Sequence, residues 1–350
     1  MRNDEGKLKS IMEKGINMKN TLTLLAMTAS LAACAPHEHD GHHEHDHGGD
    51  SHADTAIASA QDITGVIFTS TARNCADYAS EYTSNVKDIN ENTAYTGSLK
   101  VSLENGKCLF NTNAIPNHDF NDGSRTFHNA VSEQDVTYTI PQSPSMSGKT
   151  SQLSLRADKA IFLNGVKLDL LAVGCFGVGN GFVGCGDTNQ PFRFDPMSKL
   201  NKFGTDSHNA HTQPDGTYHY HGNPLAMFTA SSKAASPVIG FAADGFPIYG
   251  SYFDDNGTIR KAKSSFVLKD NGGPRIDVVY SGKTYSPGGN YNGQFVDDFE
   301  YDALAGDLDE CNGMTVNGSY GYYVTDAYPW VLKCLKGSPD DSFNKRRGRR

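Results

Sequence analysis

Residues 160–173 read AIFLNGVKLDLLAV, and this stretch decides the fold class. Two short apolar runs, 160–163 and 167–173, stand on either side of Asn164-Gly165, a dipeptide that favours the tight turn of a β-hairpin. Asp244-Gly245 stands between apolar runs in the same way. The sequence therefore predicts a hairpin or another tight turn at both positions.

Short β-type runs of the same kind recur along most of the chain. They lie at 65–69, 98–103, 136–140 and 152–155, and turn-forming residues separate them. Glycine accounts for 36 of the 350 residues, and helical periodicity is confined to residues 76–88, which are predicted to form a helix. We therefore expect a mainly β fold, with one Gly-rich, disulfide-tied domain that is sandwich-like or an irregular barrel and has few helices.

The composition excludes several classes of protein. With 37% hydrophobic and 20% charged residues, the chain is not a coiled coil, a multi-span membrane protein or a fully disordered chain. Its formal net charge of −9 gives no field that would attract nucleic acid. The absence of HExxH, P-loop, nucleophile-elbow and strand-linked GxGxxG motifs gives little weight to the common hydrolases and to nucleotide- or dinucleotide-binding enzymes.

The N-terminal region has the features of an export signal. A basic start at Met18 precedes an uncharged apolar stretch, 21–31, which is too short to span a membrane as a stable helix. Residues 31–34 read LAAC and resemble a bacterial lipobox, in which the cysteine becomes the lipidated N-terminus. We expect residues 1–33 to be the signal, with the true start at Met18. Cys34 would then anchor the exported protein to a membrane of the bacterial cell envelope, with the outer membrane as the expected location.

A histidine-rich tether is predicted over residues 34–60. Residues 36–52 read PHEHDGHHEHDHGGDSH, a composition that cannot bury a core and that predicts disorder. Closely spaced imidazoles and carboxylates bind Zn²⁺, Cu²⁺ or Ni²⁺, whereas the alternative is a hydrophilic spacer, and the two roles are compatible. The candidate ligands of the tether are His37, His39, His42, His43, His45, His47 and His52.

Six cysteines follow Cys34, an even number that predicts up to three disulfides in an exported chain. The sequence alone does not fix the connectivity, and the alternative is free buried thiols. No CxxC pair occurs, so neither a thiolate zinc site nor a thioredoxin-type redox pair is expected. Proximity along the chain suggests the pairs Cys75 with Cys108, Cys175 with Cys185, and Cys311 with Cys334.

Four histidines fall within residues 204–224, which read GTDSHNAHTQPDGTYHYHGNP. In a strand over 217–221, His219 and His221 would lie on one face and two tyrosines on the other. The turn at residues 214–216 can fold His208 and His211 back against that strand. Three or four imidazole nitrogens would then form a site suited to Zn or Cu. The alternative is a hydrogen-bonded structural cluster of histidines.

Several blocks of the sequence resemble the bacterial YHYH-domain proteins. The first is YHYH at 218–221 with the residues before it, and the second is IGFAADGFPIYG at 239–250. The third is LDECNG at 308–313, followed by GSYGYY at 318–323. Residues 113–118, NAIPNH, are similar to the family's Asn-Gly-Ile-Pro-x-His element, with Ala114 in place of the glycine. The resemblance extends from about residue 110 to residue 337.

The resemblance implies membership of that family and enlarges the candidate site. It adds His118 as a fifth metal ligand and marks Asp244 and Asp309 as lower-ranked supporting carboxylates. Asp244-Gly245 is equally explained as a plain turn, and Asp309 can equally face solvent. The segment at 318–323 has the cadence of 216–221 without either histidine, and we interpret it as a degenerate internal repeat that serves structure.

Together these patterns predict an envelope-anchored lipoprotein that binds Cu or Zn at a histidine cluster. The ligands would be His208, His211, His219 and His221, within a β domain over residues 61–338, and residues 339–350 would form a basic disordered tail. One alternative is a metalloenzyme at the same cluster, either a Zn hydrolase or a Cu oxidoreductase. The other is a structural or adhesion module without metal, and protein partners are left open.

Overall fold

The structure, a computed structural model, describes residues 59–124, 126–201 and 203–345. The predicted signal, Cys34, residues 34–58 of the tether with its seven histidines, and residues 346–350 lie outside the described residues. Within the described part of the chain, no helix is both long and apolar enough to cross a membrane.

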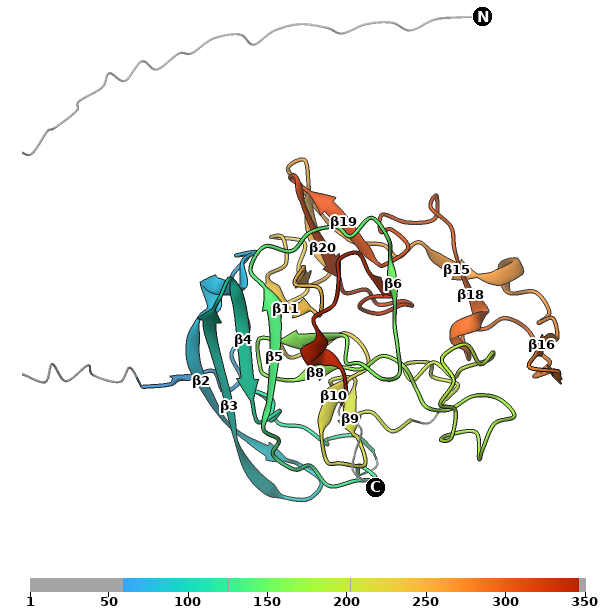
Figure 1. Cartoon of the computed structure of the whole chain (residues 1–350), viewed down its shortest axis with the longest axis horizontal. Helices are drawn as coiled ribbons and strands as arrows, with labels where there is room; N and C mark the ends of the chain where they lie inside the picture. Colours follow the sequence, from blue (N-terminus) through green and yellow to red (C-terminus); the bar gives the residue numbers. More distant parts are fainter. Residues whose placement is uncertain (1–58, 125, 202, 346–350) are drawn as a thin grey trace, which may run out of the picture. The chain divides into compact units, whose positions relative to one another are not determined.

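A five-stranded sheet forms the N-terminal part of the domain, and its strands run from blue to green in Figure 1. The strands follow chain order, and all neighbours pair antiparallel except the first two, which run parallel. The strands are β1 (Gln61–Asp62), β2 (Ser80–Asp88), β3 (Thr93–Glu104), β4 (Lys107–Thr112) and β5 (Val136–Pro141).

An eight-stranded sheet carries the YHYH segment. Its order is β19 (Gly313–Val316), β20 (Ser319–Tyr323), β12 (Pro247–Tyr249), β11 (Val238–Ala242), β7 (Ala160–Phe162), β8 (Lys167–Leu168), β10 (Tyr218–Tyr220) and β9 (Ala210–Thr212). Asn164-Gly165 joins β7 to β8 and Asp244-Gly245 joins β11 to β12, and both connections are antiparallel. The two predicted turns are therefore present.

The strands of this sheet have the same sequence of pairings when they are followed inward from either edge. An antiparallel edge pair, a parallel contact and a hairpin follow one another from β9 to β7 and again from β19 to β11. At the centre Ile161 lies opposite Phe241, with Ala160 opposite Ala242 and Phe162 opposite Gly240. The strand directions and this register give the sheet a local two-fold arrangement.

The remaining strands form two-stranded pairs. They are β13 (Tyr252–Asp255) with β14 (Thr258–Lys261), β15 (Phe266–Leu268) with β18 (Phe299–Tyr301), β16 (Val278–Tyr280) with β17 (Lys283–Tyr285), and β6 (Ser151–Gln152) with β21 (Cys334–Leu335). The helices of the described chain are short 3₁₀ turns at Cys75–Tyr78, Lys269–Gly272, Val296–Asp298 and Asp341–Phe343.

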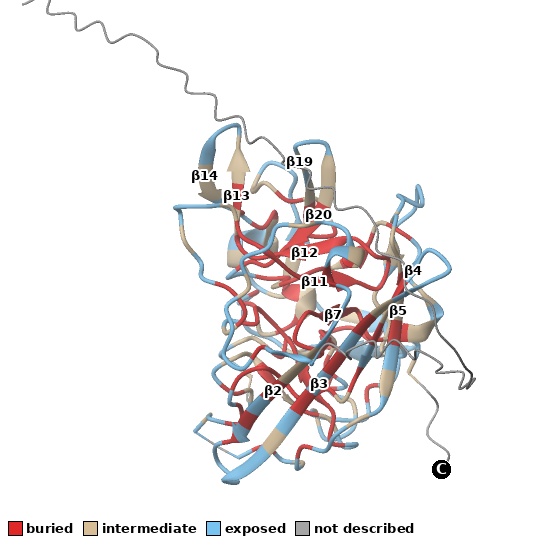
Figure 2. Ribbon diagram, turned by 90° about the vertical axis from the view of Figure 1, so that its left-hand side faces the viewer, coloured by how far each residue is buried: buried red, intermediate tan, exposed pale blue. Residues whose placement is uncertain are grey.

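Both large sheets contribute to one hydrophobic core. Phe241 of β11 packs against Phe110 of β4, with ring centroids 6.0 Å apart, and edge-on against Tyr78 at 5.8 Å. Figure 2 shows buried residues throughout β7, β11 and β12, whereas parts of β2 and β3 are exposed. The domain is mainly β and sandwich-like, as predicted, and no sheet in the described chain closes into a barrel.

Three disulfides tie these elements together. They join Cys75 to Cys108, Cys175 to Cys185 and Cys311 to Cys334, which are the pairs suggested by proximity along the chain. All six cysteines are buried.

Two of the predicted elements are wrong. Residues 76–88 are not a helix, because after one 3₁₀ turn they form β2, which pairs with β3 along its whole length and buries alternate residues. Residues 65–69 are not a strand, because their N–H groups bond to loops, such as Phe68 N to Met227 O at 2.8 Å. The strands predicted at 152–155 and 167–173 exist but are shorter.

The folded domain extends beyond residue 338, the boundary that the sequence predicted. Phe343 is buried and packs on Tyr138 with ring centroids 4.8 Å apart, and Asn344 forms a β-bridge with Ala157. The first part of the predicted tail, residues 339–345, is therefore packed on the domain.

Candidate metal centre

The hairpin of β9 and β10 brings two of the predicted ligands together. The turn between them is closed by a bond from Gly216 N to Gln213 O at 2.9 Å, and Gly216 has a φ of 81°, which favours glycine. His219 consequently lies opposite His211. His221 follows directly after β10 and points to the same side as His219, as the alternation predicts.

The His triad, His211, His219 and His221, has its Nε2 atoms directed at one another. His221 Nε2 lies 3.0 Å from His219 Nε2 and 3.0 Å from His211 Nε2. His219 and His221 are buried, and His211 is partly exposed. In the described part of the chain, these three form the one group of histidine, cysteine or acidic residues close enough to hold an ion.

Hydrogen bonds on the far side of two rings define their protonation. His211 Nδ1 lies 2.9 Å from Phe203 O, and His219 Nδ1 lies 3.3 Å from Thr217 O. A carbonyl oxygen only accepts hydrogen bonds, so both Nδ1 atoms carry the proton and both Nε2 atoms present lone pairs in the neutral imidazole. The same pattern fixes the orientation of histidine ligands in metal sites.

The triad remains neutral at physiological pH. Burial, together with the neighbouring imidazoles, holds the pKa of His219 and of His221 well below the ordinary histidine value. Burial also lowers the pKa of His211. Neutral imidazole is the form that binds metal ions, so protons compete weakly for these nitrogens.

The donor set fits a transition-metal ion. Two lone pairs, on His211 and His219, face His221 Nε2, and a single N–H there cannot satisfy both with good geometry. Nitrogens bound at about 2.0–2.1 Å around a tetrahedral ion lie about 3.3 Å apart, close to the separations observed here. A cation among the three Nε2 atoms would satisfy all of them.

His208 and His118, both predicted as ligands, do not join the triad. Their rings contact each other instead, with centroids 4.0 Å apart and planes tilted by 46°. His118 Nε2 accepts a hydrogen bond from Tyr220 Oη at 2.6 Å, because its Nδ1 donates to Asp119 O. Tyr220 projects from the face of β10 opposite the triad, so this pair lies on the other side of the sheet. Burial, with His208 beside it, lowers the pKa of His118 to about 3.

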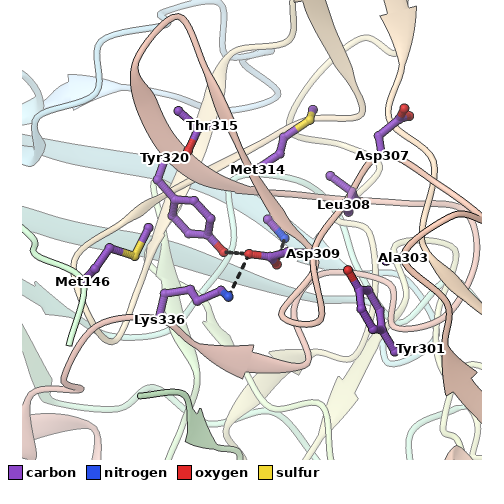
Figure 3. A pocket seen from close by; sticks show the side chains of 11 residues that line it. Met146, Tyr301, Ala303, Asp307, Leu308, Asp309, Met314, Thr315, Tyr320 and Lys336 are labelled. Carbon is purple, nitrogen blue, oxygen red and sulfur yellow. Dashed lines mark hydrogen bonds and ion pairs between the residues drawn. The ribbon is translucent and has the colours of Figure 1, made fainter. Parts of the chain in front are cut away.

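Asp244 and Asp309 also have other partners than the triad. Asp244 Oδ2 accepts hydrogen bonds from Tyr322 Oη at 2.7 Å and from Gly337 N at 2.9 Å. Asp309 lines a surface pocket, where it accepts a hydrogen bond from Tyr320 Oη at 3.0 Å and pairs with Lys336 Nζ at 3.2 Å (Figure 3). Asp309 thus lies beside the β19–β20 edge hairpin, whereas Asp244 ties the β11–β12 turn to β20.

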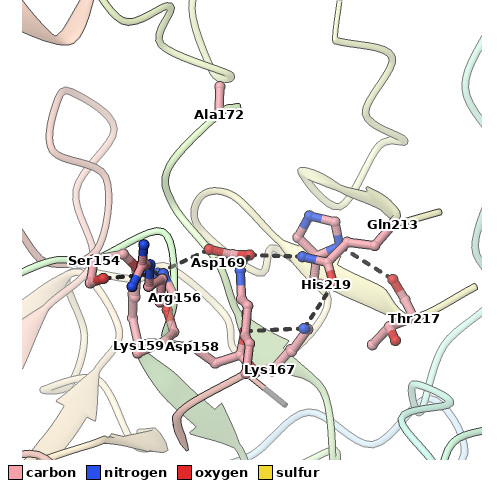
Figure 4. Close-up of polar contacts among 12 residues, drawn as sticks. Ser154, Arg156, Asp158, Lys159, Lys167, Asp169, Ala172, Gln213, Thr217 and His219 are labelled. Carbon is pink, nitrogen blue, oxygen red and sulfur yellow. Dashed lines mark hydrogen bonds and ion pairs between the residues drawn. The ribbon is translucent and has the colours of Figure 1, made fainter. Parts of the chain in front are cut away.

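The sequence reasoning missed a charged network beside the triad. Lys167 lies opposite His219 on the neighbouring strand β8, and Asp169 N donates to Tyr220 O at 3.0 Å. Figure 4 shows Asp169 and Gln213 next to His219. Burial alone would raise the pKa of the Asp169 carboxyl, but Lys159 and Lys345 bring it well below the ordinary value. Only strand pairing places these residues at the site, so no spacing in the sequence signals them.

Comparison with known proteins gives one match. The family model described as YHYH protein matches residues 137–337, which include the triad and both edges of the eight-stranded sheet. None of the curated proteins and none of the solved structures compared matches the chain. The match covers more than half of the chain and includes the tetrapeptide at 218–221, and the chain therefore belongs to the YHYH family.

Proposed function

We propose that this protein is an exported, lipid-anchored transition-metal-binding protein that holds one Zn or Cu ion at the His triad. The observation that carries the proposal is the convergence of three neutral Nε2 atoms, two of which are oriented by Nδ1–H bonds to backbone carbonyls. Zn²⁺ and Cu²⁺ are the ions that favour imidazole ligands in such a set.

Export is supported by the cysteines and by the sequence before the domain. Three disulfides persist in an oxidising compartment and are rare in the cytosol. The LAAC sequence at 31–34 supplies Cys34 for a lipid anchor, and the tether after it would gather metal ions near the domain. The tether and the triad are therefore proposed as two metal-binding parts of one chain.

Metal content is the direct test of this proposal. The tether histidines must first be replaced, because they would bind metal ions themselves. The full chain with all seven tether histidines replaced by asparagine, called here the tether-silenced chain, is prepared from an oxidising compartment without an affinity His tag. Elemental analysis is expected to find close to one equivalent of Zn or Cu. Replacing His219 and His221 with alanine should abolish it.

The matched control is the second histidine pair. Replacing His118 and His208 with alanine also removes two imidazoles, but these lie on the other side of the sheet, so metal content should stay at one equivalent. Metal loss in both double variants would refute the three-ligand site. Absence of metal in the tether-silenced chain would show that the histidine cluster is structural and leave the tether as the metal binder.

A second function, metal-dependent catalysis, is favoured by the number of ligands. Structural zinc sites have four protein ligands, whereas catalytic sites have three and leave one position for substrate or solvent. The described residues bring three histidines together. Hydrolysis screened with the Zn-loaded chain and oxidation screened with the Cu-loaded chain test this function, and activity must disappear in the His219→Ala, His221→Ala variant.

A further inference from the structure

The local two-fold arrangement of the eight-stranded sheet extends to individual side chains. Copy one comprises residues 160–169 and 206–221, and copy two comprises residues 240–249 and 309–323. Tyr220 lies opposite Leu168 and Ala210, and Tyr322 lies opposite Ile248 and Gly313. The two copies therefore have the same strand pairing in the same register.

The loop that enters the edge hairpin has the same hydrogen bonds in both copies. Asp206 Oδ1 accepts from His208 N at 3.0 Å and Ala210 N at 3.1 Å. Asp309 Oδ1 accepts from Cys311 N at 2.9 Å and Gly313 N at 3.0 Å. The residue between these donors is an asparagine with positive φ in both loops, 64° and 69°.

On one face of the sheet, the two copies also share the same tyrosine hydrogen bonds. Tyr220 Oη bonds to the side chain of Asn164 at 2.9 Å, and Tyr322 Oη bonds to that of Asp244 at 2.7 Å, each at the turn of the central hairpin. These tyrosines and the aspartate-bonded tyrosines two residues earlier maintain the fold in both copies.

The opposite face differs at every position that surrounds the triad. In copy one it carries His211, His219 and His221, together with Lys167 of β8 and Asp169, which follows β8. The equivalent positions of copy two are Met314, Gly321, Tyr323, Pro247 and Tyr249. In copy one all five positions hold histidine, lysine or aspartate. In copy two none of the five side chains is charged at neutral pH.

Copy two fills this face with aromatic packing. Tyr249 and Tyr323 stack with centroids 4.9 Å apart and planes 20° apart. A Cβ added to Gly321 would lie 2.4 Å from a ring carbon of Tyr249, so the tyrosine occupies the space that His219 takes in copy one. The backbone arrangement that the two copies share therefore does not require charged residues on this face.

The charges of copy one form a buried network next to the triad (Figure 4). Asp169 pairs with Lys159 at 3.1 Å and with Lys345, and accepts from Gln213 Nε2 at 2.7 Å. Lys167 contacts Gln213 Oε1 at 2.9 Å and Asp158 at 3.0 Å. Buried ion pairs contribute little net stability compared with well-packed apolar residues, and copy two uses such residues at the equivalent positions.

We infer that the negative charge of the Asp169 carboxylate strengthens cation binding at the His triad, and that the positive charge of Lys345 weakens it. The inference rests on the proposed function. Asp169 lies on the triad's face, and in low-dielectric surroundings its charge acts on a cation there with little screening. Gln213 joins the two opposite charges on this face, because its Nε2 donates to Asp169 and its Oε1 accepts from Lys167.

Opposite effects of two substitutions test the inference. In the tether-silenced chain, Asp169→Asn is expected to weaken Zn²⁺ binding about 10-fold, because the substitution removes a negative charge close to the cation. Lys345→Gln removes a positive charge from a partly exposed side chain and should tighten Zn²⁺ binding. Affinity is measured by competition with a chromophoric chelator, and melting temperature is recorded for each variant.

The matched control is a buried ion pair away from the triad. Arg275 and Asp298 pair at 2.8 Å and are almost fully buried, so Asp298→Asn should lower the melting temperature and leave Zn²⁺ affinity unchanged. If Asp169→Asn and Lys345→Gln shift the melting temperature but not the affinity, or shift the affinity in the same direction, the inference is overturned. If the tether-silenced chain binds no Zn²⁺ or Cu²⁺ at all, the proposed function itself fails, and the two failures are therefore distinguishable.

Discussion

Tyr218 Oη donates a hydrogen bond to Asp206 Oδ2 across 2.8 Å, and Tyr320 Oη donates the same bond to Asp309 Oδ2 across 3.0 Å. In copy one the bond joins β10 to the loop that precedes β9, so it holds His211 opposite His219. In copy two the same bond joins β20 to the loop that precedes β19, and neither strand carries a histidine. Comparing the two bonds therefore distinguishes the contribution of such a bond to folding from its contribution to metal binding.

Tyr218→Phe is expected to weaken both folding and metal binding. Loss of the bond leaves a buried carboxylate with one donor fewer and should lower the free energy of unfolding by about 1–3 kcal/mol. Zn²⁺ affinity of the tether-silenced chain should fall several-fold, because the loop before β9 loses a tie to β10. Tyr320→Phe should lower stability by less, because Asp309 is partly exposed and also pairs with Lys336, and it should leave Zn²⁺ affinity unchanged. Equal affinity losses in the two variants would contradict this account.

Metal binding is expected to stabilise the folded domain. An ion that binds only the folded chain at about 100 times its Kd adds about 2.7 kcal/mol to the free energy of unfolding. The melting temperature of the tether-silenced chain should therefore rise by several degrees with Zn²⁺ and fall back with a chelator. The His219→Ala, His221→Ala variant serves as control, and a comparable rise there would place the ion elsewhere.

The stability of the protein should depend on pH through Asp195. Burial raises the pKa of this carboxyl to about 6, although Trp330 Nε1 donates to it at 3.0 Å and Met197 N at 3.0 Å. Because the folded pKa lies above the unfolded value, Asp195 favours folding fully below about pH 4, and this contribution is lost as pH rises through about 6.

Replacing Asp195 with asparagine removes that titration. The free energy of unfolding of Asp195→Asn, relative to the unmodified chain, should increase by about 3 kcal/mol between pH 4 and pH 8, since one unit of pKa corresponds to about 1.4 kcal/mol. Urea denaturation at several pH values measures it, and the contributions of other groups cancel in the difference. A difference that does not change with pH would mean that the Asp195 carboxyl titrates normally.

The disulfide of copy two should contribute to stability and not to metal binding. Cys311 and Cys334 are separated by 23 residues, and closing a loop of this length is worth about 3 kcal/mol in the chain-entropy account. Replacing both with alanine should lower the melting temperature while the tether-silenced chain still binds one metal ion. Loss of the ion from a folded Cys311→Ala, Cys334→Ala variant would show that the two copies are coupled.

Local signals predicted much of this molecule correctly. Asn164-Gly165 and Asp244-Gly245 form their turns, because the left-handed conformation of the glycine is a local requirement, with φ values of 81° and 87°. Alternation along residues 217–221 places His219 and His221 on one face for an equally local reason. The helix predicted over 76–88 is wrong, because pairing with β3 overrides the local preference of this segment.

The tertiary structure decided which histidines meet. The sequence by itself determined the β character, the disulfide-forming cysteines, the family and the pairing of His219 with His221, because each depends on residue type and short spacing. It did not determine that His208 turns to His118 on the far side of the sheet, or that Asp169 and Lys167 lie beside the triad. Those neighbours arise from the register of β8, β9 and β10, in which distant segments are aligned by hydrogen bonds and core packing that no local spacing encodes.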